Sequence, residues 1–229
     1  MDEGKKIGYI RLSQIGKQST EEMRAALDDL KARGMKALIL DLRDNPGGVL
    51  DGAVAISDLF VENGRIVTVK SRKEEAVYDA KAEGTFSGFP MAVLVNRHTA
   101  SAAEIIAACL QDHRRAVVIG ERTFGQGIVR SLLQLESGLG ALKLPVAVYY
   151  RPSGKSMNRY PDSKESDDWG VQPDAGYEVP LTTEELKQYQ RERAERAERD
   201  VFNSAPAPID QIQDRPLEKA LEYMVAQLR

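Results

Sequence analysis

The sequence predicts an α/β domain built around a largely parallel β-sheet. Short apolar runs of strand length recur along the first 120 residues, and segments with helical spacing of apolar residues separate them. Strands that alternate with helices are typical of this class. Two of the runs, 37–42 and 91–96, are almost continuously apolar, as expected for central strands buried on both faces of a parallel sheet.

The first elements are a strand at 7–12 and a helix after it. Ser19 and Glu22 have the spacing of a capping box, so we expect Ser19 to cap this helix. Gly34 stands where the C-terminal cap of the same helix is expected. The next expected elements are strand 37–42, a helix around 52–61, strand 65–71, strand 91–96, helix 102–112 and strand 116–120.

From Gly127 onward the pattern changes. Segments 128–135 and 141–150 flank a glycine-containing loop and predict a β-hairpin. Segment 151–174 is rich in Pro, Gly, Ser and Asp, which predicts a long loop.

The last fifty residues form a separate, charged extension. Eleven charges occupy the seventeen residues 184–200, and Glu192 with Arg196 and Glu195 with Arg199 have i,i+4 spacing. We interpret this stretch as a solvated helix whose start Thr182 and Glu185 cap. A linker at 203–208 and a final amphipathic helix that docks on the core follow. We therefore expect a core domain at 1–180 and an extension at 181–229.

Composition excludes several classes of function. The chain has 229 residues, a net charge of −3, one cysteine (Cys109) and two histidines (His98 and His113). A disulfide framework, a Cys-rich zinc site and a multi-histidine metal site are excluded, and we expect no metal and no cofactor. The mixed charge gives no reason to expect a nucleic-acid partner. No run reaches the ~18 apolar residues of a membrane span, and the charged start leads straight into a strand pattern unlike that of a signal peptide.

Three motifs follow buried strands, where open α/β sheets place ligands. The first, Asp44-Asn-Pro-Gly47-Gly48, is either a simple turn or a source of amides for an oxyanion hole. The second places Ser101 three residues before Glu104, so Ser101 is either a helix N-cap or a nucleophile at a helix N-terminus. The third presents Gln126 between two glycines, either as a flexible turn or as an exposed polar group.

Four stretches together resemble the C-terminal processing peptidases, also called tail-specific proteases. They are LILDLRDNPGG, TASAAEIIAACLQDHRRAVVIGERTFG, ALKLPVAVYYRPSGKSM and WGVQPD, in the order and spacing of that family, and the similarity runs from residue 7 to about 174. The resemblance implies a ClpP/crotonase-like serine peptidase core. Complete members carry an upstream PDZ domain that binds the substrate C-terminus, and nothing in this chain resembles one.

The resemblance assigns roles to individual residues. Ser101 falls on the nucleophile, and the amides of Ala102 and of Gly47 or Gly48 fall on the oxyanion hole. The general base of the family is a Lys twenty-five residues after the Ser, and this chain has Gln126 there. Four residues later the family has an orienting Gln, and this chain has Arg130.

The two departures bear directly on activity. A Gln amide cannot act as a base near neutral pH, and the guanidinium of Arg130 stays protonated. His98, on the loop before Ser101, is the best replacement base by intrinsic pKa. Lys143 and Lys155 could serve only if the fold brings them close, whereas His113 is expected about 15 Å away at the far end of the helix.

Three functions compete on this sequence. The first is a C-terminal processing peptidase with a weakened or relocated base, and the second is a pseudopeptidase that binds peptides without cleaving them. The third, an acyl-CoA enzyme of the crotonase type, is disfavoured by the peptidase-like motifs around Ser101. The partners implied are polypeptide substrates or peptide C-termini, and a homo-oligomer is left open. The family also implies an exported compartment such as the periplasm, the cell envelope or the thylakoid lumen.

Overall fold

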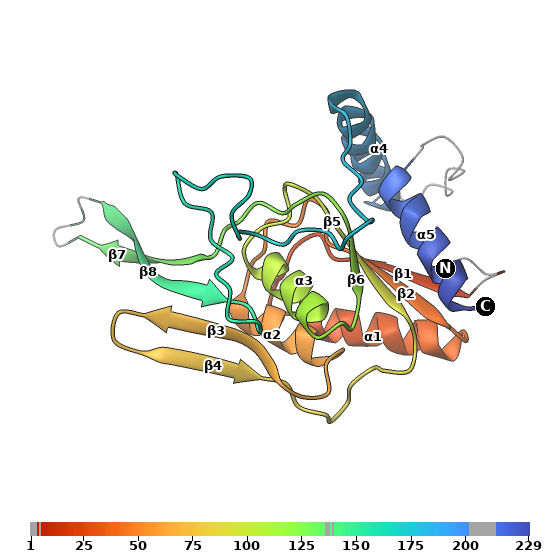
Figure 1. Ribbon diagram of the computed structural model, residues 1–229, viewed down its shortest axis with the longest axis horizontal. Coiled ribbons are helices and arrows are strands. Elements are labelled where there is room, and N and C mark those ends of the chain that lie inside the picture. Colours follow the sequence, from red (N-terminus) through yellow and green to blue (C-terminus); the bar gives the residue numbers. More distant parts are fainter. Residues whose placement is uncertain (1–3, 5, 136–137, 139, 202–213) are drawn as a thin grey trace.

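The chain folds into two four-stranded sheets (Figure 1). The computed structural model describes residues 4, 6–135, 138, 140–201 and 214–229, with the backbone alone for 196–201. The first sheet is parallel, in the order β1-β2-β5-β6, with strands β1 (Ile7–Arg11), β2 (Ala37–Asp41), β5 (Met91–Val95) and β6 (Val117–Gly120). The second is antiparallel, in the order β4-β3-β8-β7, with strands β3 (Arg65–Ser71), β4 (Glu75–Asp79), β7 (Ile128–Gln134) and β8 (Ala141–Tyr150).

Helices cover both faces of the parallel sheet. One face packs against α1 (Ser19–Ala32), α2 (Leu50–Asp58) and α3 (Ala102–Asp112). The other face packs against α5 (Arg215–Gln227), whose Ala220 and Met224 are fully buried. No helix among the described residues has the length and apolar character needed to cross a membrane.

Strand β2 illustrates why the sheet is buried on both sides. All five of its residues are buried. Leu38 and Leu40 point into the cluster with α1 to α3, and Ala37 and Ile39 point into the cluster with α5, because successive side chains of a strand face opposite sides of the sheet. The prediction of a central strand at 37–42 is therefore confirmed.

The parallel arrangement brings three loops together at one edge of the sheet. Strands β2, β5 and β6 are neighbours and run in the same direction, so the loops after their carboxyl ends lie side by side. These loops are residues 42–49, 96–101 and 121–127. Each contains one of the three motifs that the sequence singled out.

Several local predictions need correction. Ser19 is the first residue of α1 and does not cap it; its Oγ accepts a hydrogen bond from the amide of Gly16 at 2.9 Å. Strand β4 was not predicted, because all but one of its residues are exposed and the strand carries no apolar alternation. Strand β3 belongs to the antiparallel sheet, where it pairs with β8 as well as β4.

The C-terminal extension is more tightly attached than a solvated helix. Helix α4 (Thr183–Val201) begins with the predicted capping box, in which the Thr182 amide donates to Glu185 at 2.7 Å and the Glu185 amide donates to the Thr182 hydroxyl at 3.2 Å. Tyr189 of the same helix is buried. The predicted linker at 203–208 and the side chains of Arg196 and Arg199 lie outside the described residues.

Candidate active site

Ser101 occupies a strained position between β5 and α3. It is the N-cap residue of α3 and forms a capping box with Glu104. Its φ of 55° lies in the left-handed region, which is uncommon for a residue with a side chain and clusters at functional sites. The next amide, that of Ala102, belongs to the first turn of the helix, where N–H groups lack intrahelical acceptors. A hydroxyl, an amide and the positive end of a helix dipole therefore meet at one place.

The turn formed by residues 42–48, here called the 42–48 turn, packs directly against Ser101. A Cβ atom on Gly47 would lie 2.7 Å from the Ala100 oxygen, 2.8 Å from the Ala102 nitrogen and 2.9 Å from the Ser101 Cβ. The φ of Gly47 is +95°, a conformation that glycine adopts readily and other residues do not. Glycine at position 47 thus allows the turn to approach Ser101.

The hydrogen bonds distinguish the two glycines. The amide of Gly47 donates to Oδ1 of Asn45 at 2.8 Å and is therefore already used. The amides of Gly48 and Ala102 donate to no acceptor among the described residues. The two unused amides lie on segments that contact each other through Gly47, and free backbone amides are the donors that an oxyanion hole uses.

Glu104 connects the loop that contains Ser101 to the loop that contains Gln126. Its buried carboxylate accepts the amides of Ser101 at 2.8 Å, Gly125 at 2.7 Å and Gln126 at 2.8 Å, and the Thr123 hydroxyl at 2.5 Å. Burial raises the pKa of Glu104 above its ordinary value of 4.5, and these four donors offset part of that rise. Sequence reasoning recognised Glu104 only as a capping residue.

The third loop places Gln126 and Arg130 in different surroundings. Gln126 is half-buried, and its backbone is held by Glu104. Gly127 has no room for a side chain, because a Cβ would lie 2.5 Å from the Asn158 nitrogen. Arg130 is exposed on β7, opposite Pro145 of β8. The roles of Gln126 and Arg130 in chemistry remain predictions.

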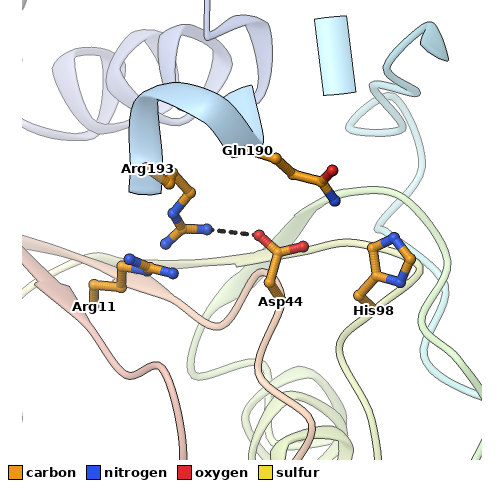
Figure 2. A pocket seen from close by; sticks show the side chains of 5 residues that line it. All are labelled: Arg11, Asp44, His98, Gln190 and Arg193. Atoms are coloured by element: carbon orange, nitrogen blue, oxygen red, sulfur yellow. Dashed lines mark hydrogen bonds and ion pairs between the residues drawn. The ribbon is translucent and has the colours of Figure 1, made fainter. Parts of the chain in front are cut away.

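His98 lines a separate open pocket of about 320 Å³ (Figure 2). Its other lining residues are Arg11, Asp44, Gln190 and Arg193. Figure 2 shows the imidazole on the side of Asp44 away from Arg193. No hydrogen bond among the described residues joins this ring to Ser101.

The remaining candidate bases lie elsewhere. Lys155 pairs with Asp168 at 2.9 Å and lines a pocket with Asp112, which belongs to the last turn of α3. The eleven residues of α3 span about 16 Å, so Asp112 and Ser101 lie at opposite ends of the helix. Lys143 faces Leu132 across the β7–β8 ribbon, which projects from the body of the molecule (Figure 1).

The structure also places His113 and Cys109, the two other residues that the sequence analysis considered. Nε2 of His113 donates a hydrogen bond to the carbonyl of Arg65 at 2.7 Å. Cys109 is buried inside α3, and burial raises the pKa of its thiol to about 12. Among the described residues, no three His, Cys, Asp or Glu side chains gather in a group able to hold a metal ion.

Sequence reasoning overlooked a buried ion network beneath the 42–48 turn. Arg43 is 2% exposed and donates from Nε to Asp41 at 3.0 Å and from Nη1 to Asp214 at 2.7 Å. Burial raises the pKa of Asp41, but the charge and hydrogen bonds of Arg43 outweigh it and the net pKa is lowered. Charged residues that interrupt an apolar strand pattern at 41 and 43 were the available signal.

Comparison with known proteins identifies the family of the chain. Residues 6–177 match the sequence profile of Peptidase family S41. The carboxy-terminal-processing protease of Bartonella bacilliformis is 35% identical over an alignment that covers 95% of this chain and 52% of that protein. The carboxyl-terminal-processing protease of Synechocystis sp. is 38% identical over 78% of this chain and 39% of that protein. The chain thus spans about half, or less, of the length of these relatives.

Solved structures share the fold. A photosystem II D1 C-terminal processing protease superposes with a TM-score of 0.67 at 33% identity, covering 79% of this chain and 43% of that one. A putative S41 protease from Bacteroides fragilis superposes with a TM-score of 0.66 over 96% of this chain and 55% of that one, at 20% identity, and supports the fold alone. The predicted α/β class is confirmed, and the chain belongs to peptidase family S41, with carboxy-terminal-processing and tail-specific proteases among its relatives.

Proposed function

We propose that this chain is the core of a C-terminal processing serine peptidase in which Ser101 is the nucleophile and the amides of Ala102 and Gly48 form the oxyanion hole. The observation that supports the proposal is the contact between the 42–48 turn and Ser101, where Gly47 leaves no room for a Cβ atom against residues 100–102. The unused amide of Gly48 follows Gly47 directly in the chain. Gly48 is favoured over Gly47 because the Gly47 amide is already bonded to Asn45. The substrate class is polypeptides or peptide C-termini.

The arrangement suits acyl transfer. Ser101 Oγ would form a bond to the scissile carbonyl carbon while its proton leaves to a base, and the carbonyl oxygen would take up negative charge against the two amides. Collapse of this intermediate would break the C–N bond, with a proton returned to the leaving amine. Water would then hydrolyse the ester, releasing the new carboxyl end and restoring Ser101.

Gln126 limits this chemistry. An amide side chain donates and accepts hydrogen bonds but takes no proton near neutral pH. The loss of a general base lowers the rate by about 10²- to 10⁴-fold. We therefore expect slow hydrolysis, with a replacement base such as His98 or water. His98→Ala in the same protein tests the first option, because an unchanged rate of turnover in this variant would exclude the imidazole as the base.

A second function, a peptide-binding pseudopeptidase, is supported by one specific observation. Gln126 stands at the position of the family base and Arg130 at the position of the orienting Gln, so both are changed, while Ser101, Ala102 and Gly48 are retained. Such a protein would hold an extended peptide without cleaving it.

One set of variants separates the two functions. The parent, Ser101→Ala and Gln126→Lys are incubated with an unfolded polypeptide and, separately, with a serine-directed phosphonate. The peptidase function predicts phosphonate labelling of the parent well above that of Ser101→Ala, and turnover raised about 10²- to 10⁴-fold in Gln126→Lys. Equal turnover by the parent and Ser101→Ala, with no labelling but measurable peptide binding, would establish the pseudopeptidase instead.

The compartment is also part of the proposal. Relatives from Tetradesmus obliquus and Arabidopsis thaliana are described as chloroplastic, and a tail-specific protease of Haemophilus influenzae is 37% identical over 67% of this chain. On this basis we assign the protein to an exported compartment such as the periplasm or cell envelope. Fractionation of cells that express the full gene, with immunodetection of this domain, tests the assignment.

A further inference from the structure

The C-terminal extension, residues 181–229, reaches the 42–48 turn with three side chains. Tyr189 and Arg193 come from α4, and Asp214 is the N-cap residue of α5. Figure 2 shows α4 above the turn, with Arg193 directed at Asp44. These contacts join segments about 150 to 170 residues apart in the chain.

Asp214 and Tyr189 enclose Arg43 from the side opposite β2. The Asp214 carboxylate accepts Nη1 of Arg43 at 2.7 Å and Nη2 at 2.9 Å, a bidentate pair. The Tyr189 ring lies 4.6 Å from the guanidinium carbon of Arg43. Asp41 holds the remaining edge of the same guanidinium, at 3.0 Å from Nε and 2.8 Å from Nη2. Arg43 is therefore bound by Asp41 of β2 on one side and by the C-terminal extension on the other.

Arg193 holds the next residue of the turn. Its Nη1 donates to Oδ2 of Asp44 at 2.9 Å and to the Arg43 carbonyl at 3.4 Å. Asp44 has a φ of 58°, a left-handed conformation that costs free energy and persists only when the surroundings impose it. Asn96 supplies the other constraint, bonding the Asp44 amide at 3.0 Å and the Asp44 carboxylate at 2.8 Å.

Residues 43 and 44 depend on such side-chain contacts, because no backbone–backbone hydrogen bond among the described residues holds either of them. Between residues 42 and 48 of the described chain, one internal backbone hydrogen bond is formed, from the Asn45 amide to the Leu42 carbonyl at 3.2 Å. Asn45 then bridges to Leu12 at 2.7 Å and to the Gly47 amide at 2.8 Å. The turn is also anchored at the carbonyls of Asn45 and Gly47, which accept the backbone amides of Ala100 and Ile15 at 2.9 Å. A displacement of residues 43–44 would have to reach Gly48 through this segment.

We propose that the C-terminal extension positions the oxyanion hole: Tyr189, Arg193 and Asp214 hold residues 43–44 of the turn and thereby place the Gly48 amide beside that of Ala102. The catalytic consequence rests on the proposed peptidase function, whereas the effect on the turn does not. Removal of an oxyanion-hole donor costs about 10²- to 10³-fold in kcat. A shifted donor should cost less, so we expect about 10- to 100-fold for loss of one positioning residue.

The test measures the turn and the chemistry separately in the full chain. The variants are Arg193→Ala and Asp214→Asn, where Asn still accepts the Leu217 amide as an N-cap but loses the charge that pairs with Arg43. Arg191→Ala is the matched control, because it removes the same charge from an exposed position of the same helix. Amide hydrogen exchange is followed for a peptide that spans residues 42–48, and the rate of phosphonate labelling is followed at Ser101.

In Arg193→Ala and Asp214→Asn we expect amide exchange in 42–48 to be at least 10-fold faster and labelling of Ser101 to be 10- to 100-fold slower. Arg191→Ala should behave like the parent in both measurements, and Arg193→Lys should partly restore both rates. Unchanged exchange in both variants would overturn the proposal. Faster exchange with unchanged labelling would also overturn it, since the turn would then be loosened without consequence for the nucleophile. If the parent itself is not labelled, the peptidase function fails, and the exchange rates alone decide whether the extension positions the turn.

Discussion

Replacing Gly47 by Ala perturbs the contact on which the candidate site depends. The added Cβ would meet the Ala100 oxygen at 2.7 Å, the Ala102 nitrogen at 2.8 Å and the Ser101 Cβ at 2.9 Å. Two of these three are backbone atoms at the start of α3, so the new methyl group cannot be accommodated by a side-chain rotation. The turn and the nucleophile must move apart.

The cost has two parts. The φ of +95° at Gly47 strains any other residue, by about 1 to 3 kcal/mol. Overpacking of a closely packed contact adds about 1 to 3 kcal/mol. We expect the free energy of unfolding to fall by roughly 2 to 6 kcal/mol in total.

Gly176→Ala is the matched control, because it separates the two parts. Gly176 has a φ of +84°, and nothing lies within 4 Å of its ideal Cβ position. It therefore carries the conformational strain without the collision. For a chain of this size, each kcal/mol corresponds to about 2 to 4 °C in Tm, so Gly47→Ala should melt about 2 to 12 °C below Gly176→Ala.

Thermal unfolding followed by circular dichroism, together with phosphonate labelling of Ser101, completes the assay. We expect slower labelling in Gly47→Ala and a labelling rate like that of the parent in Gly176→Ala. Equal melting temperatures and equal labelling rates for the two variants would refute the reasoning, because the collision would then have no effect.

Three further predictions concern stability. Met224→Ala removes a fully buried side chain between α5 and the sheet and should lower the free energy of unfolding by about 2 to 5 kcal/mol, as measured in urea; a loss below 1 kcal/mol would mean that α5 is not docked. Asp41→Asn leaves the buried charge of Arg43 with one carboxylate in place of two and should cost about 3 kcal/mol in the same assay; an unchanged midpoint would contradict the network. The hydrogen bond from Arg215 lowers the pKa of Glu185 to about 2, so the stabilisation from this pair is present above pH 4.5 and lost as the pH falls towards 2; an NMR titration of the Glu185 carboxyl carbon checks this, and a midpoint near 4.5 would exclude it.

Most of the core elements could be predicted because their signals are local. The run at 37–42 and the helical spacing after Ser101 each reflect the burial pattern of a single element, and β3 and α3 have the bounds that the sequence predicted. Strand β4 carries no such signal, because it is paired at an exposed edge of the antiparallel sheet. Its formation depends on pairing with β3, and not on burial of its own side chains.

The candidate site was only partly accessible from sequence. The motifs around Ser101, Gly47 and Gln126 could be located because they follow buried strands. The choice between Gly47 and Gly48 required the bond from the Gly47 amide to Asn45. The placement of His98 on a pocket beside Asp44 likewise required the fold.

The sequence by itself determined the α/β class, the order of the core strands and helices, the three loops that hold the candidate motifs and the replacement at Gln126. All of these depend on residue types and short spacings along the chain. Only the tertiary structure decided that α4 and the N-cap of α5 contact the 42–48 turn, because the bond between Arg43 and Asp214 joins residues 171 positions apart. In a helix with many charged residues of both signs, the spacing of residue types does not indicate which side chain contacts a buried arginine. Such a pairing depends on where the sheet places the two segments, and that placement is a property of the whole fold.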